Sequence, residues 1–165
     1  MEIFRDKRNG KLWFSQQKYV ENILSMFGMN NVKLVLVPLA SHFKLSSSLS
    51  PSTKEQKEYM SRIPYANAVG SLMYAMVSTR PDISHAVGVV SRFMENPGKE
   101  HWAAVKWVLR YLRGTSDYCI TYSSGRELVC GYVDSDFAGD LDKRRSTSGY
   151  VFTLAGGAIS WISKL

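Results

Sequence analysis

Cysteine is scarce in this chain, with only two among 165 residues, so no disulfide framework holds it together. Long apolar runs are missing as well, and no segment approaches the roughly 20 residues of a membrane-spanning helix. The first ten residues lack the apolar stretch of a secretory signal peptide. These absences predict a protein of the cytoplasm or nucleus with reduced cysteines.

Apolar side chains and positive charge are both plentiful. Hydrophobic residues make up 45% of the chain, which is enough to bury a core and excludes a chain that is disordered throughout. Lysine and arginine outnumber aspartate and glutamate by 21 to 14, so the formal net charge is +7. A balance this basic fits a polyanionic partner such as RNA or DNA.

The first 29 residues predict a β-hairpin followed by a helix. Asn9-Gly10 supplies a residue pair that tolerates positive φ in a tight turn between two short apolar strands within residues 1–15. Ser15 caps a helix predicted over Gln16 to about Phe27, and Gly28 ends it. The apolar positions of this helix fall on one face: Tyr19, Val20, Ile23, Leu24 and Phe27.

A linker is expected over residues 30–60, before a helical region. Ser46–Ser52 holds five serines and a proline, and Pro38 interrupts the apolar run that precedes it, so we expect this stretch not to pack. Three helices are then predicted over residues 61–114. They cover Tyr65–Thr79, Asp82–Glu95 and Lys99–Arg113.

The ends and faces of these helices follow from single residues. Arg80-Pro81 disfavours continuation of the first helix, and Gly114 stops the third. The buried side of the third helix is expected to consist of Trp102, Val105, Leu109 and Leu112.

Residues 115–165 predict an antiparallel sheet. Its strands are expected at 117–122, 128–133, 150–154 and 158–162. The sheet would expose an apolar face, which favours self-association unless the preceding helices cover it. A two-residue turn at Ser124-Gly125 would place Cys119 directly opposite Cys130, as reduced neighbours.

Two carboxylates, Asp134 and Asp136, follow the second of these strands. The sequence Asp-Ser-Asp-Phe-Ala-Gly-Asp (134–140) with Arg-Ser-Thr-Ser-Gly-Tyr (145–150) resembles the start of the ribonuclease H domain in copia-type retrotransposon Pol polyproteins. Further motifs resemble the same family in the same order: Pro-Tyr-Ala-Asn-Ala-Val-Gly-Ser-Leu-Met-Tyr (64–74), Ser-Thr-Arg-Pro-Asp-Ile (78–83) and Trp-Val-Leu-Arg-Tyr-Leu-Arg-Gly-Thr (107–115). The resemblance covers nearly the whole chain.

The resemblance implies an α+β fold assembled from parts of two enzymes. Residues 1–29 would be the end of the polymerase palm hairpin and a thumb-like helix. Residues 61–114 would be a connection-like region of three helices, and residues 115–165 an incomplete ribonuclease H-like module with an antiparallel sheet.

The same resemblance makes Asp136 the candidate first metal ligand of the parent nuclease, with Asp134 as the near alternative. Two-metal cleavage needs several carboxylates from different parts of a fold, and the family draws its other ligands from downstream segments. Its polymerase motif, Tyr-Val-Asp-Asp, would lie before Met1. We therefore expect no enzyme activity and no cofactor for this chain, Mg²⁺ being implied for the parent enzyme only. The alternative role of these carboxylates is solvation at a turn.

A basic stripe is expected on the third helix. Lys99, Lys106, Arg110 and Arg113 recur at intervals of seven, four and three, which places them along one side of it. Such a stripe can track the phosphates of RNA or DNA, and the alternative is a solvated surface face. The three histidines show no ligand spacing, so no metal site is expected from them.

Arg110-Tyr111-Leu112-Arg113 is also similar to the Arg-x-Leu-Arg motif of secreted oomycete effectors, the RxLR family. That resemblance implies a secreted protein that enters plant host cells, contacts a host protein and suppresses immune cell death. Such effectors carry a signal peptide and place the motif in a flexible region near the N-terminus. Here Leu112 falls on the predicted buried face of a helix.

Overall fold

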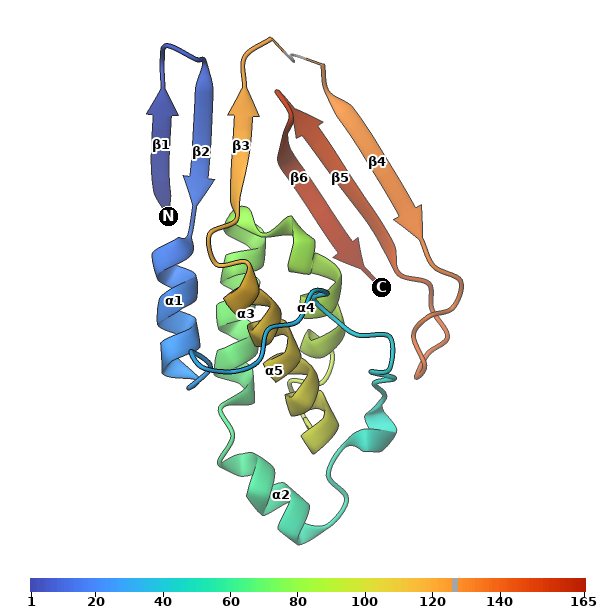
Figure 1. Ribbon diagram of the computed structural model, residues 1–165. Coiled ribbons are helices and arrows are strands. Elements are labelled where there is room, and N and C mark those ends of the chain that lie inside the picture. The colour runs from blue at the N-terminus through green and yellow to red at the C-terminus, as the bar shows by residue number, and fades with distance from the viewer. Residues whose placement is uncertain (126–127) are drawn as a thin grey trace.

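The computed structural model describes residues 1–125 and 128–165 and shows a helical body joined to two antiparallel sheets (Figure 1). In chain order the elements are β1 (Glu2–Asp6), β2 (Lys11–Ser15), α1 (Gln17–Met26), a 3-10 turn η1 (Ser47–Leu49), α2 (Lys54–Ser61), α3 (Tyr65–Thr79), a second 3-10 turn η2 (Pro81–Ile83), α4 (Ser84–Ser91), α5 (Lys99–Gly114), β3 (Cys119–Ser123), β4 (Cys130–Ser135), β5 (Ser148–Leu154) and β6 (Gly157–Lys164). The predicted α+β class is confirmed. Among the described helices, none is both long and apolar enough to cross a membrane.

The predicted N-terminal hairpin and helix are confirmed, with a longer turn than expected. Asp6 pairs with Lys11, so four residues rather than two form the loop, and the Asp6 carboxylate accepts the N–H groups of Arg8 and Asn9. Gly28 ends α1 as predicted, because it adopts a left-handed φ of 65°.

Four helices, α1, α3, α4 and α5, enclose the core. The bounds of α3 match the prediction, and α5 extends one residue further to Gly114. The predicted helix Asp82–Glu95 is shorter, since it begins as η2 and α4 ends at Ser91. The chain then turns through i to i+3 hydrogen bonds at Phe93 and Met94 before Pro97, which disfavours helical backbone ahead of it.

Residues 30–60 pack against the helical body, so the expectation that this linker stays unpacked is wrong. Leu45 is buried, and Val35, Leu39 and Phe43 contact the core cluster. Trp107 of α5 fastens the segment by donating its indole N–H to the carbonyl of Val37 at 2.9 Å. Sequence composition pointed to flexibility, whereas widely spaced apolar side chains between the polar ones supply the packing.

The four predicted C-terminal strands do not form one sheet. β3 pairs with β2 to give the order β1-β2-β3, while β4, β5 and β6 form a second sheet. The predicted pairing of Cys119 with Cys130 is therefore wrong: Cys119 lies opposite Ser15, and Cys130 lies opposite Thr153. Residue 126, which the predicted hairpin turn required, lies outside the described residues.

An aromatic contact explains why β3 joins the N-terminal hairpin. Phe14 of β2 lies opposite Ile120, which is buried, and packs edge-on against Tyr122 with ring centroids 5.5 Å apart. Cross-strand aromatic and β-branched pairs stabilise a sheet, so β2 provides β3 with a better partner than the exposed β4 does. A pairing across more than 100 residues cannot be derived from local turn signals.

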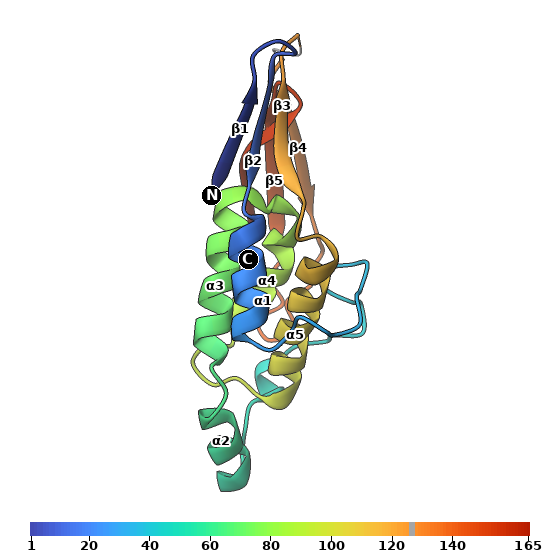
Figure 2. The ribbon, with the colours of Figure 1, turned by 60° about the vertical axis from the view of Figure 1, so that its left-hand side comes forward.

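The two sheets meet where β3 approaches β6 (Figures 1 and 2). The N–H of Ser123 donates to the carbonyl of Ala155 at 2.8 Å, and the Tyr122 hydroxyl donates to that of Ala158 at 2.6 Å. Gly157 permits this approach, because a Cβ there would lie only 2.7 Å from the Thr121 carbonyl oxygen. The hairpin, the helices and the second sheet are thereby joined into one body.

The β4-β5-β6 sheet has one covered and one open face. On the covered face, Trp161 donates its indole N–H to the carbonyl of Met76 in α3 at 3.1 Å. The open face carries Val133, Phe152 and Ile162, which are 82%, 39% and 39% exposed. The helices thus cover one side of this sheet only, and self-association through the other side stays a prediction.

Candidate functional site

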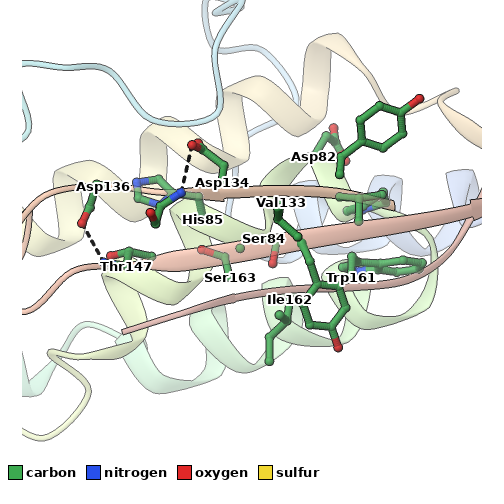
Figure 3. A pocket seen from close by; sticks show the side chains of 16 residues that line it. Asp82, Ser84, His85, Val133, Asp134, Asp136, Thr147, Trp161, Ile162 and Ser163 are labelled. Carbon is green, nitrogen blue, oxygen red and sulfur yellow. Dashed lines mark hydrogen bonds between the residues drawn. The ribbon is translucent and has the colours of Figure 1, made fainter. Parts of the chain in front are cut away.

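The two predicted catalytic carboxylates line a cleft between the second sheet and the helices. This cleft, of about 370 Å³, lies between η2 and the first residues of α4 on one side and β4, β5 and β6 on the other (Figure 3). Asp134 and Asp136 come from the end of β4, and His85 of α4 faces them. Trp161 of β6 closes the opposite end.

Asp136 organises the β4–β5 connection. Its carboxylate accepts the N–H of Thr147 at 2.7 Å and the N–H of Gly139 at 3.3 Å, closing the chain into a loop. The hydrogen bond from Thr147 is the main cause that lowers the pKa of Asp136 below its ordinary value. Among the described residues, the one hydrogen bond to the Asp134 carboxylate comes from the N–H of the following residue, Ser135, at 2.9 Å.

The other two acidic residues of this connection are turned away from the cleft. Asp140 is 6% exposed and pairs at 3.3 Å with Arg92, the residue that follows α4. Asp142 accepts both the N–H and the hydroxyl of Ser47 in η1. Within residues 1–125 and 128–165, no cluster of three His, Cys, Asp or Glu side chains could hold a metal ion. The described residues therefore do not fit a two-metal centre.

Two of the four cations in the predicted basic stripe of α5 form hydrogen bonds within the chain. Arg110 donates its Nε to the carbonyl of Lys33 at 2.6 Å, and Arg113 donates to the carbonyl of Val32. These two arginines therefore hold the segment after α1 against α5. Of the lysines, Lys99 stacks over the Tyr59 ring at 4.7 Å, and Lys106 is exposed.

The Arg-x-Leu-Arg sequence is part of the packed core. Leu112 is fully buried and Tyr111 is 8% exposed. The flanking Arg110 and Arg113 are half-buried and donate to backbone carbonyls, so the four residues are held in a rigid helix. A linear motif must present its side chains to the protein that binds it, and the buried Leu112 is not accessible in this arrangement.

A buried arginine network that sequence reasoning missed connects η2 to the end of α5. Arg80 is 2% exposed and forms a two-pronged pair with Asp82, with its Nη2 2.7 Å from Oδ2. It also donates to the carbonyl and hydroxyl of Thr115, at 2.9 and 2.6 Å. Tyr111 donates its hydroxyl to Asp82, and burial, together with that carboxylate, raises the pKa of Tyr111 to about 12. The network fixes η2, whose residues Pro81 and Asp82 line the cleft, to the end of α5.

His101 is a second buried polar residue whose role the sequence did not indicate. Its Nδ1 accepts the N–H of Gly98 at 2.8 Å, which caps the start of α5, and its Nε2 lies 3.1 Å from the carbonyl of Ser46. These partners require a neutral ring with the proton on Nε2. The ring also stacks on Phe93, at 4.0 Å between centroids.

We expect acidification to destabilise the protein through His101. Burial lowers the pKa of His101 below the ordinary value of a histidine, about 6.5, so the neutral form stabilises the fold above that pH and this contribution is lost as the pH falls below it. Thermal unfolding midpoints between about pH 7 and 5 should fall, and the fall should be smaller in His101→Gln. His42→Gln, at an exposed histidine, is the control that should keep the full pH dependence. An unchanged pH profile in His101→Gln would contradict the assignment.

Sequence comparison finds relatives among transposon proteins. All 165 residues align at 59% identity with the "Retrovirus-related Pol polyprotein from transposon TNT 1-94" of Nicotiana tabacum, over 12% of that polyprotein. The "Retrovirus-related Pol polyprotein from transposon RE2" of Arabidopsis thaliana is 40% identical over 93% of the chain and 10% of its own length. The chain thus spans about a tenth of these relatives.

A relative of another kind covers part of the chain. The "Secreted RxLR effector protein 161" of Plasmopara viticola is 52% identical over 106 residues, which is 64% of the chain and 75% of that protein. No family model matches the chain. No solved structure matches it either.

Proposed function

Because this chain belongs to the copia-type family of retrotransposon Pol polyproteins, we propose that its residues form a non-catalytic, nucleic-acid-binding part of such a polyprotein. The observation that carries this proposal is the alignment of the whole chain, at 59% identity, with the tobacco polyprotein. In this assignment residues 1–29 are the end of the polymerase palm and the start of the thumb. Residues 61–114 are the connection, and residues 115–165 begin the ribonuclease H module.

Charge supports a nucleic-acid partner. The net charge of +7 favours association with a polyanion. The cations lie on one folded body, because β3 pairs with β2 of the N-terminal hairpin and residues 30–60 pack on the helical core. The expected binding is independent of sequence, because contacts to phosphates carry no base information. Its affinity should fall steeply as the salt concentration rises.

The contacts of the acidic residues in the β4–β5 connection support a non-catalytic role for residues 1–165 on their own. A two-metal nuclease needs carboxylates that are free to bind both ions. Asp136 accepts two backbone N–H groups, Asp140 is paired with Arg92, and Asp142 is bound to Ser47. These hydrogen bonds shape the β4–β5 connection, which is a structural use of the carboxylates.

We expect the purified chain, supplied with Mg²⁺ or Mn²⁺, neither to extend a primer nor to degrade the RNA of an RNA–DNA hybrid. The reason is the missing set of metal ligands among the described residues. Gel assays of a labelled primer and a labelled hybrid measure both activities, with an active ribonuclease H as the positive control. Cleavage of the hybrid that disappears in Asp136→Asn would contradict the proposal.

A secreted effector is the second candidate function, and the 52% identity with the Plasmopara viticola protein is the observation that favours it. In that case the chain, or a protein that contains it, would act inside plant cells on a host protein. The packing of Leu112 in the core weighs against use of Arg110–Arg113 as an accessible motif. Substitution of Arg110 and Arg113 distinguishes the two functions.

A further inference from the structure

The connection between β4 and β5 carries three consecutive exposed cations, Lys143, Arg144 and Arg145. In the part of the chain that the structure describes, none of the three takes part in an ion pair. Of the acidic residues of the same turn, Asp140 is buried and pairs with Arg92, whereas Asp142 is exposed and accepts hydrogen bonds from Ser47. The outer surface of this basic turn, residues 143–145, therefore carries an excess of positive charge, because three cations lie beside a single exposed carboxylate.

The backbone of the basic turn is held in one conformation. The Asp140 N–H donates to the carbonyl of Arg145 at 3.1 Å, and the Arg144 N–H donates back to the carbonyl of Asp140 at 3.0 Å. The buried carboxylate of Asp140 also accepts the N–H of Lys143 at 2.8 Å. A preformed surface loses little conformational entropy when it binds, so its charges contribute more fully to affinity.

Asp142 anchors the same turn to the helical body. Its carboxylate accepts two hydrogen bonds from Ser47, in the segment that His101 fixes to the start of α5. The cations thus project from a connection that is tied at both Asp140 and Asp142, rather than from a free loop. By contrast, Arg110 and Arg113 of the predicted stripe donate to backbone carbonyls of the chain.

Building on the proposed function, we infer that the basic turn docks on the phosphate backbone of a nucleic-acid duplex. Two guanidinium groups and an ammonium group on adjacent residues match the closely spaced charges of a phosphate backbone, and arginine binds phosphate oxygens in a two-pronged manner. The docking surface lies on the β4–β5 connection, whereas the predicted stripe lies on α5.

The test compares binding of the wild type and of a triple variant to a fluorescein-labelled RNA–DNA hybrid by anisotropy, across a series of salt concentrations. The variant carries Lys143→Ser, Arg144→Asn and Arg145→Ser. Asparagine is chosen at residue 144 because φ there is 53°, a conformation that it tolerates. Each lost phosphate contact lowers the slope of log K against log salt by roughly 0.9 for B-DNA, so a decrease of about 2–3 is expected.

Two further variants serve as controls. One removes the same number of charges elsewhere on the surface, and the other changes the side chains of the turn but keeps their charge. Lys54→Ser, Lys57→Ser and Lys164→Ser together remove the same charge from exposed positions elsewhere, and should leave most of the slope intact. Arg144→Lys with Arg145→Lys keeps the charge of the turn, so it should keep the slope. An equal loss of slope in the control triple would overturn the assignment to the basic turn.

The failure of the inference and of the proposed function give different results. If the wild type shows no salt-dependent binding to the hybrid, the proposed function fails and the inference fails with it. If the wild type binds and the turn variant binds equally well, only the inference fails. A turn variant that loses binding to poly-glutamate but not to the hybrid would assign the surface to an acidic protein, and would also overturn the inference.

Discussion

Replacing Arg80 with Met is expected to lower the free energy of unfolding by about 3–5 kcal/mol, because it breaks a buried ion pair by removing one partner. The guanidinium is 2% exposed and satisfies three acceptors at once: the Asp82 carboxylate and the carbonyl and hydroxyl of Thr115. Methionine fills a similar volume but removes the cation that pairs with Asp82, which keeps the hydroxyl of Tyr111 as a donor, and it removes the donor to the Thr115 hydroxyl. Urea denaturation followed by tryptophan fluorescence measures the loss.

The chain offers a matched control for Arg80→Met. Arg62 pairs with Glu58 at 2.8 Å, nearly the same distance as Arg80 with Asp82, but the side chain of Arg62 is 76% exposed. An exposed pair of this kind is worth less than about 1 kcal/mol, so Arg62→Met should have little effect on stability. Equal losses in the two variants would mean that burial does not set the value of the Arg80 pair.

Arg80 also shows what the sequence could and could not indicate. Arg80-Pro81 correctly predicts the end of α3 at Thr79, because a residue before proline avoids the helical region. Nothing local indicates that the arginine is buried, since its acceptors include Thr115, which lies 35 positions further along the chain. Burial of a charge depends on such distant partners.

The same distinction holds for the sheets and for the cleft. Periodicity and turn residues predict the β1–β2 hairpin, α1, α3 and α5, because these elements are determined by neighbouring residues. The pairing of β3 with β2 joins residues more than 100 positions apart and was missed. Asp134 and Asp136 were found from their motif, whereas the opposing His85 comes from a helix whose contact with the cleft only the fold reveals.

The linker shows how composition can mislead about packing. Serines and Pro38 indicated an unpacked segment, yet Arg110 and Arg113 donate to its carbonyls and Trp107 fixes Val37. Backbone carbonyls accept hydrogen bonds whatever the side chain, so they leave no signal in the sequence. The sequence therefore predicts the basic stripe of α5, but it does not indicate that two of its arginines bind backbone carbonyls of the same chain.

Replacing Leu112 with Ala is expected to cost about 2–5 kcal/mol of stability, because the side chain is fully buried and its removal leaves a cavity. Leu36 is 94% exposed, and Leu36→Ala should change stability by no more than about 0.5 kcal/mol. Thermal or urea unfolding of both variants checks the difference. A loss in Leu112→Ala as small as that in the control would show that α5 does not pack as described.

Leu112 and its flanking arginines also separate the two candidate functions. Arg110→Ala with Arg113→Ala should cost about 1 kcal/mol for each hydrogen bond to the carbonyls of Lys33 and Val32, a larger effect than for exposed arginines. If the chain is part of a polyprotein, this double variant should still fold, and its salt-dependent affinity for nucleic acid should fall at most in proportion to the phosphate contacts that it loses.

If the chain is an effector, the same folded variant should no longer suppress cell death in leaves, and its affinity for nucleic acid should be unchanged. A wild type that suppresses cell death and shows no salt-dependent binding to RNA or DNA would exclude the nucleic-acid-binding role. A nucleic-acid-binding protein with this net charge must bind the polyanion in a salt-dependent way.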